Sequence, residues 1–228
     1  MVFSGFQKLT LLDFPGKIAC ILFTGGCNFR CPFCHNASLV RLKDTQEYST
    51  EEILSFLKKR QGILEGVCIS GGEPLLQNGL SDFLREVKAL GYSVKLDTNG
   101  SFPKKLKALV EEGLVDYVAM DIKNSFEKYE ETAGAKVDAD AIKESMEFLL
   151  ADNVEYEFRT TLVKELHTAE DVESIAKTIK GAKKYFLQNF VDSGDILCQN
   201  MSAFSEEEMK NMEKSARKYL PNAAIRGV

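Results

Sequence analysis

The sequence predicts an α/β fold, a partial, TIM-like (β/α)6 barrel with parallel strands inside and helices outside. Two observations carry this prediction. Short apolar segments alternate with helical patterns about six times along the 228 residues, which is typical of a parallel sheet flanked by helices. Polar residues directly follow most of the apolar segments, as they do where strand ends form a ligand site. Eight units would close a full barrel, so six indicate a partial barrel or an open sheet.

The candidate strands are short, and most are rich in β-branched or aromatic residues, as buried parallel strands are. They cover Ile18–Thr24, Gly66–Ser70, Ser93–Thr98, Tyr117–Asp121, Glu155–Leu162 and Tyr185–Phe190. The polar residues that follow them are Gly25-Gly26-Cys27, Gly71-Gly72-Glu73, Thr98-Asn99-Gly100, Asp121 with Lys123, and Gln188-Asn189. Turns favour Gly, Asp and Asn, so turn formation explains some of these residues, but it does not explain the cysteines.

The intervening helices are indicated by start signals, stop signals and periodicity. Ser49-Thr50-Glu51-Glu52 is a capping box, and it predicts a helix that continues through Leu57. Apolar residues spaced three and four apart predict helices over Leu80–Val87, before Gly91, and over Val172–Ile179. Further helices are expected over Lys104–Glu112, Asp140–Ala151 and Glu206–Tyr219.

The whole chain, residues 1–228, is expected to form one domain. Hydrophobic residues make up 44% and charged residues 28% of it, an ordinary balance for a soluble globular protein, and one α/β domain of this size is common. No linker, repeat or low-complexity segment stands out. The polar region Lys123–Asp140 is long for a connection, and we expect a mobile or partner-facing loop there.

Charge and hydropathy narrow the classes of function. A net charge of −5 with a pI near 5.3 argues against nucleic acid as the main ligand, because phosphate binding needs a basic surface. No apolar run is long enough to span a bilayer, and the N-terminus lacks the basic start, apolar core and cleavage site of a signal peptide. We therefore expect a cytoplasmic protein without membrane contact.

Three of the six cysteines lie within the sequence Cys27-Asn28-Phe29-Arg30-Cys31-Pro32-Phe33-Cys34. Disulfides are not expected in a chain without an export signal, so the spacing indicates a metal site. Three thiolates from one short loop can bind three irons of a [4Fe–4S] cluster and leave the fourth iron open for a substrate, whereas a four-cysteine cluster is closed. Amide N–H groups of such a loop can also point at the cluster sulfurs.

A zinc site is the alternative, with His35 as a fourth ligand beside the three cysteines. It is disfavoured because adjacent residues such as Cys34 and His35 rarely reach one tetrahedral ion together, and no second ligand pair is present. The other cysteines, Cys20, Cys68 and Cys198, stand alone in apolar contexts, and we expect them in the core.

With Phe33 before its third cysteine, the motif C-x3-C-x-Phe-C resembles the signature of the radical S-adenosylmethionine (SAM) superfamily. The wider sequence resembles the glycyl-radical-enzyme activating enzymes through Asp13-Phe14-Pro15-Gly16, Phe23-Thr24-Gly25-Gly26-Cys27 and Cys34-His35-Asn36. Within them it is most similar to the activating protein of anaerobic ribonucleoside-triphosphate reductase, and pyruvate formate-lyase activating enzyme is a near relative. The resemblance covers nearly the whole chain and implies a cluster loop at residues 24–36.

The resemblance also implies which residues bind SAM. They are Phe33 and the residues of motifs that occur in the family's order: Gly71-Gly72-Glu73-Pro74, Asp97-Thr98-Asn99-Gly100, Asp121-Ile122-Lys123 and Arg159. The backbone of the first motif is expected at the SAM amino group, since two glycines allow close approach. Lys123 and Arg159 are expected to serve a carboxylate, and Asp97 and Asp121 to serve ribose hydroxyls or a small cation. The structural alternatives are loop capping by the aspartates and a buried ion pair of Arg159.

The end of the last candidate strand departs from the family pattern. Several activating enzymes carry a histidine there, whereas this chain has Gln188 and Asn189. Any role of that histidine is therefore absent or taken by one of the two amides, which weakens an assignment to pyruvate formate-lyase activation. The chain has no ferredoxin-like cysteine insertion, so auxiliary clusters are not expected.

The resemblance implies an enzyme that reductively cleaves SAM to a 5′-deoxyadenosyl radical, which removes an α-hydrogen from a glycine of a partner enzyme. The implied partners are a glycyl radical enzyme, in the first place anaerobic ribonucleotide reductase, and an electron donor such as flavodoxin or ferredoxin. No side chain is expected as a catalyst, because the cluster and SAM carry the chemistry. Three alternatives stay open: activation of pyruvate formate-lyase or another glycyl radical enzyme, a small-molecule radical SAM enzyme of the 7-carboxy-7-deazaguanine synthase type, and a non-enzymatic iron–sulfur or zinc module.

Overall fold

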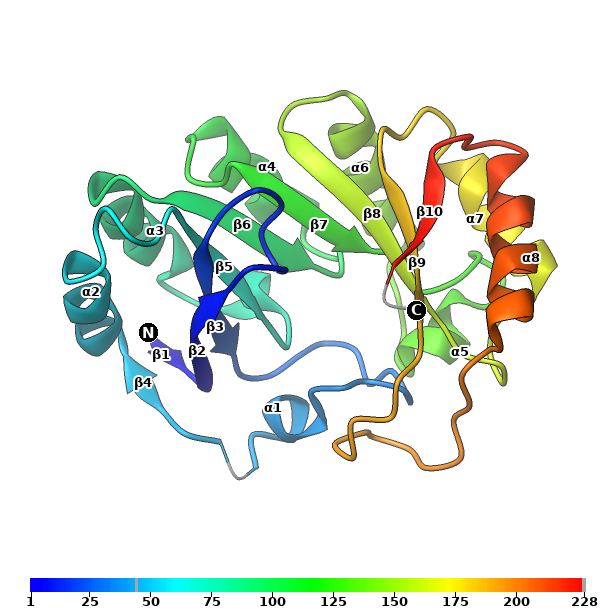
Figure 1. The fold of residues 1–228 in the computed structure, drawn as a ribbon, viewed down its shortest axis with the longest axis horizontal. Helices are drawn as coiled ribbons and strands as arrows, with labels where there is room; N and C mark the ends of the chain where they lie inside the picture. Colours follow the sequence, from blue (N-terminus) through cyan, green and yellow to red (C-terminus); the bar gives the residue numbers. More distant parts are fainter. Residues whose placement is uncertain (44, 227–228) are drawn as a thin grey trace. The chain divides into compact units, whose positions relative to one another are not determined.

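The computed structural model describes residues 1–43 and 45–226 (Figure 1). The strands are β1 (Val2–Phe3), β2 (Gly5–Thr10), β3 (Ala19–Thr24), β4 (Tyr48–Ser49), β5 (Gly66–Gly71), β6 (Ser93–Thr98), β7 (Tyr117–Asp121), β8 (Glu155–Leu162), β9 (Tyr185–Asn189) and β10 (Ala223–Arg226). The helices are α1 (Ala37–Arg41), α2 (Thr50–Lys58), the 3-10 helix η1 (Pro74–Leu76), α3 (Leu80–Ala89), α4 (Pro103–Glu111), α5 (Tyr129–Ala133), α6 (Ala139–Leu150), α7 (Ala169–Thr178) and α8 (Glu206–Arg217).

One sheet contains most of the strands, in the order β10-β9-β8-β7-β6-β5-β3-β2. β3, β5 and β6 pair in parallel, as do β8, β9 and β10, whereas β2 pairs antiparallel with β3 at the edge. β1 and β4 form a separate antiparallel pair. Helices alternate with the parallel strands along the chain, so the predicted α/β class with a mostly parallel sheet is confirmed.

The strands and helices expected from the sequence are all present. The expected strands are β3, β5, β6, β7, β8 and β9, and the expected helices are α2, α3, α4, α6, α7 and α8. The capping box of α2 forms as predicted: the Ser49 hydroxyl accepts from the Glu52 amide at 3.2 Å, and the Glu52 carboxylate accepts from the Ser49 amide at 2.8 Å. Among the described residues, no helix is long and apolar enough to cross a membrane.

The sequence does not predict β1, β2, β4 and β10, which are short or largely exposed. β10 pairs in parallel with β9, and its last residue also contacts a residue that is distant in sequence. The Arg226 guanidinium donates to both carboxylate oxygens of Glu157 in β8, at 2.8 and 3.0 Å, and lies 3.6 Å from the centre of the Phe186 ring in β9. The Glu157 side chain is 1% exposed, so this bidentate pair neutralises a buried charge.

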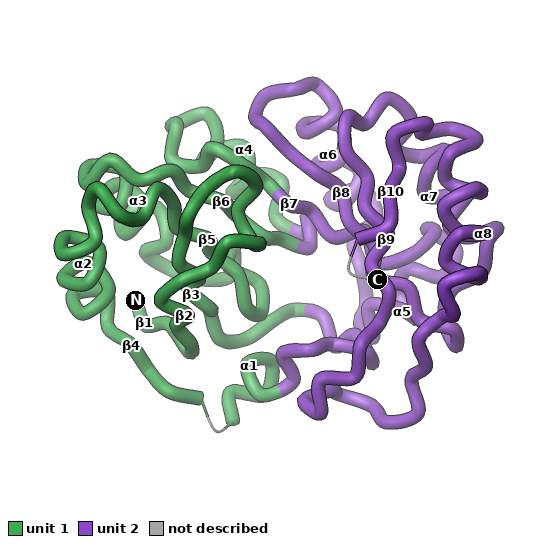
Figure 2. The backbone as a smooth tube through the Cα atoms, viewed as in Figure 1, with its two compact units in different colours: residues 1–28, 38–98, 102–118 green, residues 29–37, 99–101, 119–228 purple. Residues whose placement is uncertain are grey.

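The chain forms two compact units (Figure 2). Unit 1 contains residues 1–28, 38–98 and 102–118, and unit 2 contains residues 29–37, 99–101 and 119–228. One boundary lies within β7, and another lies between Cys27 and Cys31. The single domain expected from the sequence stays a prediction.

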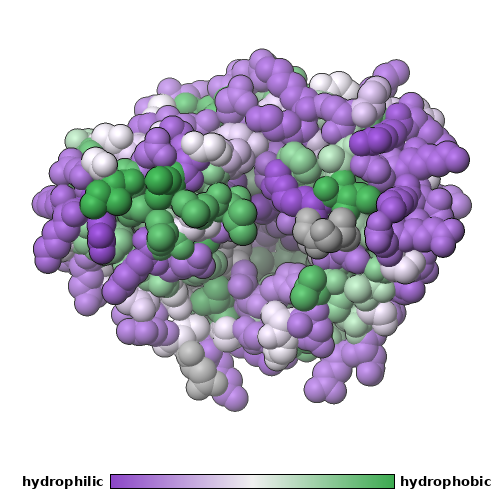
Figure 3. All heavy atoms as spheres, viewed as in Figure 1, coloured by the Kyte–Doolittle hydropathy of each residue, from purple (hydrophilic) through white to green (hydrophobic). Residues whose placement is uncertain are grey.

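Unit 1 exposes a group of large apolar side chains (Figure 3). The exposed large apolar residues of unit 1 include Leu9, Leu11, Leu12, Ile18 and Ile63, and Leu12 is 90% exposed. The first four lie on β2 or on the connection from β2 to β3, and Ile63 follows α2. Exposed apolar groups that gather on one surface are typical of protein interaction sites.

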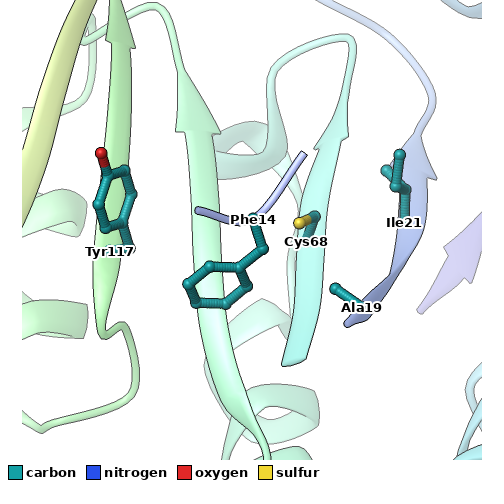
Figure 4. Packing of buried hydrophobic residues seen from close by; sticks show 5 residues of the cluster. All are labelled: Phe14, Ala19, Ile21, Cys68 and Tyr117. Atoms are coloured by element: carbon teal, nitrogen blue, oxygen red, sulfur yellow. The ribbon is translucent and has the colours of Figure 1, made fainter. Parts of the chain in front are cut away.

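Part of the core of unit 1 is built around the ring of Phe14, which lies between β2 and β3. The buried residues packed there are Phe14, Ala19, Ile21, Cys68 and Tyr117 (Figure 4). Gly66 makes room for Phe14, because a Cβ atom at residue 66 would lie 2.7 Å from the ring. Cys20 and Cys68 are fully buried, which confirms that both are core residues.

The expectation of a mobile or partner-facing loop at residues 123–140 is wrong for the part that ends at Gly134. This part contains α5, and Tyr129 and Thr132 are buried. Its polar residues bond internally: the Asn124 amide donates to the Thr132 hydroxyl at 2.8 Å and to the Leu166 carbonyl at 2.9 Å. The polar composition of this segment indicated a loop. The sequence alone could not show that Asn124 bonds to Leu166, because the two residues are distant in sequence.

Cys198 is exposed, so the expectation of a buried core cysteine is wrong at this position. It lies in the irregular segment between β9 and α8. Its backbone amide donates to the Pro32 carbonyl at 2.9 Å, so the main chain makes the contact that fixes this residue. An apolar neighbourhood in sequence predicts burial poorly where no helix or strand directs the side chain.

We expect Arg226→Met to lower the free energy of unfolding by about 1–3 kcal/mol, because it removes the charged hydrogen-bond partner of buried Glu157. Urea unfolding followed by circular dichroism measures this. The matched control is Lys210→Met, which removes an exposed pair with Glu206 and should change stability by less than about 0.5 kcal/mol. Equal effects of the two changes would contradict the role assigned to Arg226.

Candidate functional site

The three cysteines of the motif lie in the loop that connects β3 to α1. Cys27 is half-buried and belongs to unit 1, whereas Cys31, which is buried, and Cys34, which is half-buried, belong to unit 2. The Cys34 amide donates to the Cys31 carbonyl at 3.0 Å, which closes a tight turn between these two cysteines. Burial raises the pKa of the Cys34 thiol, and the charge of Lys123 opposes this rise without cancelling it.

Backbone hydrogen bonds from distant segments hold the part of the loop that belongs to unit 2. The Arg30 amide donates to Ala133 at the end of α5 at 2.8 Å, and the Cys198 amide donates to Pro32 at 2.9 Å. His35, the fourth ligand of the zinc alternative, stacks on Phe190 with ring centres 5.6 Å apart. Phe33 is buried, as expected for the aromatic residue of the motif.

The Gly-Gly-Glu-Pro motif lies directly on the backbone that precedes Cys27. The Gly72 amide donates to Thr24 and the Glu73 amide donates to Gly26, both at 2.9 Å. A Cβ atom at residue 72 would lie 1.9 Å from the Gly26 carbonyl oxygen, so only glycine fits there. The two glycines therefore serve a close approach of backbone to backbone, beside the loop that carries the first cysteine.

The carboxylate of Glu73 connects two of the predicted motifs within unit 1. It is fully buried, and it accepts from the Thr98 hydroxyl at 2.8 Å and from the Leu75 amide at 3.0 Å. These contacts join the ends of β5 and β6. Both side chains thus have a structural task, and their predicted contact with SAM stays a prediction.

Asp97 and Asn99 also have partners within the protein. Asp97 accepts from the Ser70 hydroxyl at 2.9 Å and from the ammonium group of Lys95. Lys95 is 2% exposed and was not among the expected site residues; its signal in the sequence is a cation inside a strand. Asn99 accepts from the amide and the hydroxyl of Ser101, at 3.0 and 2.5 Å, so its side chain caps its own loop.

Three charged residues of unit 2 meet where β7 ends beside the middle of β8. Asp121 accepts from Arg159 Nε at 2.9 Å and from Lys123 Nζ at 3.2 Å. Burial would raise the pKa of Asp121, but the two cations outweigh it and hold this pKa at about 2. Burial likewise opposes the charge of Lys123, but Asp121 and Cys31 outweigh it and raise the pKa of the ammonium.

Two cations and one carboxylate leave one net positive charge at this cluster, which suits an anionic ligand such as a carboxylate. The ion pair that the structural alternative described for Arg159 is present. The predicted binding of SAM by Asp121, Lys123 and Arg159 is compatible with this pair and stays a prediction.

His167 is a residue of the site that the sequence gave no reason to select. The Val163 amide donates to its Nδ1 at 3.2 Å, so Nε2 carries the hydrogen and donates to the Lys123 carbonyl at 2.8 Å. The ring also meets the edge of Phe33, with centres 6.2 Å apart. Burial lowers the pKa of His167, which keeps it neutral and suits a fixed structural tautomer.

Asn189, one of the two amide residues at the end of β9, has a clear structural task. Its side-chain amide donates to the Phe204 carbonyl at 2.8 Å, and its side-chain oxygen accepts from the Phe204 amide at 3.0 Å. These two bonds close the segment 190–204, which contains Cys198 and contacts the cysteine loop. Asn189 therefore supports the cysteine loop indirectly, by fixing the ends of the segment 190–204 that contacts this loop.

The donor set fits an iron–sulfur cluster. Thiolates are the ligands that such clusters require, and this chain supplies three of them in one loop. In the part of the chain that the structure describes, no three His, Cys, Asp or Glu side chains are gathered into a preformed metal site. The assignment of Cys27, Cys31 and Cys34 as ligands therefore stays a prediction.

Comparison with known proteins places this site in a family. The sequence model of the radical SAM superfamily matches residues 21–179. A Methanocaldococcus jannaschii protein named as a glycyl-radical enzyme activating enzyme is 35% identical, over 99% of this chain and 95% of its own. Pyruvate formate-lyase-activating enzyme of Clostridium pasteurianum is 27% identical, over 94% of this chain and 96% of its own.

A solved structure supports the fold. The radical SAM methyltransferase from Sphaerobacter thermophilus superposes with a TM-score of 0.75 at 13% identity, over 96% of this chain and 68% of that one. At this identity the likeness shows the fold alone. It agrees with the α/β architecture expected from the sequence.

Replacing Cys27, Cys31 or Cys34 singly by Ala should abolish cluster assembly, because each cysteine is predicted to bind one iron. After anaerobic reconstitution, iron analysis should find about four irons per chain in the wild type and far fewer in each variant. Cys198→Ala is the control, since this exposed cysteine lies outside the motif and should leave the iron content unchanged. Stoichiometric zinc in anaerobically purified protein would contradict the assignment.

Lys123→Ala and Arg159→Ala should each weaken SAM binding by about 1.5–3 kcal/mol, roughly ten- to a hundredfold, because each removes one charge-assisted contact. Isothermal titration of the reconstituted protein without reductant measures this affinity. Lys128→Ala is the matched control, because this lysine lies in the same connection but pairs with Asp171. Unchanged affinity in both test variants would show that the carboxylate of SAM binds elsewhere.

Proposed function

This chain belongs to the radical SAM superfamily and, within it, to the glycyl-radical-enzyme activating enzymes, and from this premise we propose that it removes an α-hydrogen from one glycine of a partner protein. The observation that carries the proposal is the 35% identity to a named activating enzyme over nearly the full length of both chains. The partner that we propose first is an anaerobic ribonucleotide reductase. An electron donor such as flavodoxin or ferredoxin completes the proposed system.

Enzymes of this superfamily use a [4Fe–4S] cluster and SAM, which together supply a 5′-deoxyadenosyl radical when bound. The residues of this chain would bind and orient these groups. Cys27, Cys31 and Cys34 would hold the cluster. The backbone at Gly71 and Gly72 lies against the start of the cysteine loop and would accept the amino group of SAM.

The charged residues would orient the rest of SAM. Lys123 and Arg159, already held by Asp121, would face the carboxylate with their net positive charge. Asp97, held by Lys95 and Ser70, would serve a ribose hydroxyl or a small cation. Because these side chains are fixed by partners before any ligand arrives, they lose little freedom on binding.

Two features support a protein as the substrate. The first feature is the sequence around the cysteines. The cysteine motif ends in Cys34-His35-Asn36, and Asp13-Phe14-Pro15-Gly16 precedes it, which resembles the activating enzymes. Unit 1 also exposes Leu11 and Leu12, at 68% and 90%, and exposed leucines of this kind suit contact with another protein. The identity of the partner rests on the resemblance of the sequence alone.

The proposal predicts a glycyl radical in the partner. Reduced enzyme, SAM and the candidate reductase, mixed without oxygen, should give a doublet EPR signal, and a partner deuterated at the radical glycine should transfer deuterium to 5′-deoxyadenosine. The reaction requires the glycine Cα in van der Waals contact with C5′ of SAM. Enzyme with Cys31→Ala is the control and should give neither signal nor transfer.

Two outcomes would redirect the proposal. Transfer of label from a small metabolite, rather than from a protein, would indicate a small-molecule enzyme of the same superfamily. A glycyl signal in pyruvate formate-lyase but not in the reductase would keep the activating role and change the partner. Absence of SAM cleavage with a fully assembled cluster would contradict enzymatic function.

A further inference from the structure

Tyr129, the first residue of α5, has a buried hydroxyl group whose hydrogen is not used. Its side chain is 2% exposed, and its hydroxyl has no hydrogen-bond partner among the described residues; it is the single buried side-chain polar atom of this kind in residues 1–43 and 45–226. Buried tyrosines normally bond their hydroxyl group, because an unbonded one loses the water that it had before folding. An unpaired hydroxyl therefore points to an acceptor that arrives with a ligand.

The ring of Tyr129 is fixed against the cysteine loop. It meets the edge of Phe29 in the motif, with centres 6.5 Å apart, and stacks on Phe126 at 5.6 Å. At the other end of α5, the Ala133 carbonyl accepts from the Arg30 amide at 2.8 Å. Gly134 passes so close that a Cβ atom there would lie 2.3 Å from the Arg30 carbonyl oxygen. Both ends of helix α5 therefore contact the cysteine loop, and these contacts fix the position of Tyr129 beside the loop.

The charges that face the hydroxyl group indicate the acceptor. Burial raises the pKa of Tyr129, the charges of Cys31 and Asp121 raise it further, and Lys123 opposes them, so the phenol stays protonated and is a donor. The Lys123 backbone amide also lies beside the oxygen, but an amide N–H is itself a donor and leaves the hydroxyl hydrogen unused. Asp121 already accepts from two cations, which makes the sulfur at Cys31 the favoured acceptor.

We propose that the Tyr129 hydroxyl donates a hydrogen bond to the sulfur at the Cys31 corner of the bound cluster, so that Tyr129 is a positioning residue that sets the ease of cluster reduction. The inference rests on the cluster assignment made in the proposed function. Reduction adds negative charge to the cluster, and hydrogen bonds to its sulfurs stabilise that charge and raise the reduction potential. Loss of the donor should therefore make the cluster harder to reduce.

The variant Tyr129→Phe removes the hydroxyl group and keeps the ring. Its matched control is Tyr185→Phe, because Tyr185 is equally buried but donates its hydroxyl to Thr160 at 3.0 Å. In the metal-free protein, Tyr129→Phe should change the free energy of unfolding little, since the hydroxyl hydrogen has no acceptor to lose. Tyr185→Phe should lower it, since its partner hydroxyl remains buried.

The decisive measurement is the midpoint potential of the reconstituted cluster, from an anaerobic redox titration followed by EPR. We expect a more negative potential in Tyr129→Phe at full iron content and an unchanged potential in Tyr185→Phe. Site-specific 3-fluorotyrosine at residue 129 is a stronger donor and should move the potential the opposite way. This second substitution decides the question should Tyr129→Phe fail to fold.

The outcomes separate this inference from the proposed function. Equal potentials in the wild type and both forms altered at residue 129, with full clusters, would overturn the inference alone. A loss of SAM affinity at unchanged potential would assign the hydroxyl to SAM and also overturn it. A shifted potential in an enzyme that produces no glycyl radical would support Tyr129 and overturn the activating role. A wild type that assembles no four-iron cluster would overturn both.

Discussion

The structure depends on fixing the backbone of an irregular loop, because three thiolates from eight residues can meet one metal group only if that loop is held from outside. Before Cys27, the Gly-Gly-Glu-Pro backbone provides this support, since Glu73 donates to Gly26 and Gly72 leaves no room for a side chain. After Cys27, the support comes from Ala133 at the end of α5 and from Cys198. The strand ends and connections thus fix the main chain of the cysteine loop. Because that main chain is fixed, the positions of the cysteine side chains are largely set as well.

Much of the fold could be predicted because its signals are local. The parallel strands are apolar and bounded by turn residues, and the capping box at Ser49 depends on residues three positions apart. What could not be predicted depends on distant partners. β10 pairs with β9 and its Arg226 reaches Glu157, which lies far away in sequence, and in the connection after Lys123 the Asn124 side chain reaches Leu166. Composition alone reads such polar segments as loops.

The site shows the same limit more sharply. Motif order placed the cysteines, the glycines and the acidic residues at the ends of strands, where the structure has them. The sequence could not show that Glu73 would bond Thr98 or that Asp121 would hold Arg159, because each contact joins side chains that are far apart in sequence. Lys95 and His167 were missed for this reason. A single lysine or histidine carries no pattern, and its meaning comes from a neighbour that only the fold supplies.

The closure of segment 190–204 by Asn189 has a consequence for how this chain can vary. Two hydrogen bonds from one side chain to Phe204 join the two ends of the segment. The distance between these ends is therefore fixed whatever the length of the segment. The entropic cost of closing a loop grows only slowly, by about 0.6 kcal/mol for each doubling in length. Insertions between Val191 and Asp195 would therefore be tolerated at little energetic cost. Relatives of this chain could thus acquire different coverings over the cysteine loop while the sheet beneath stays the same.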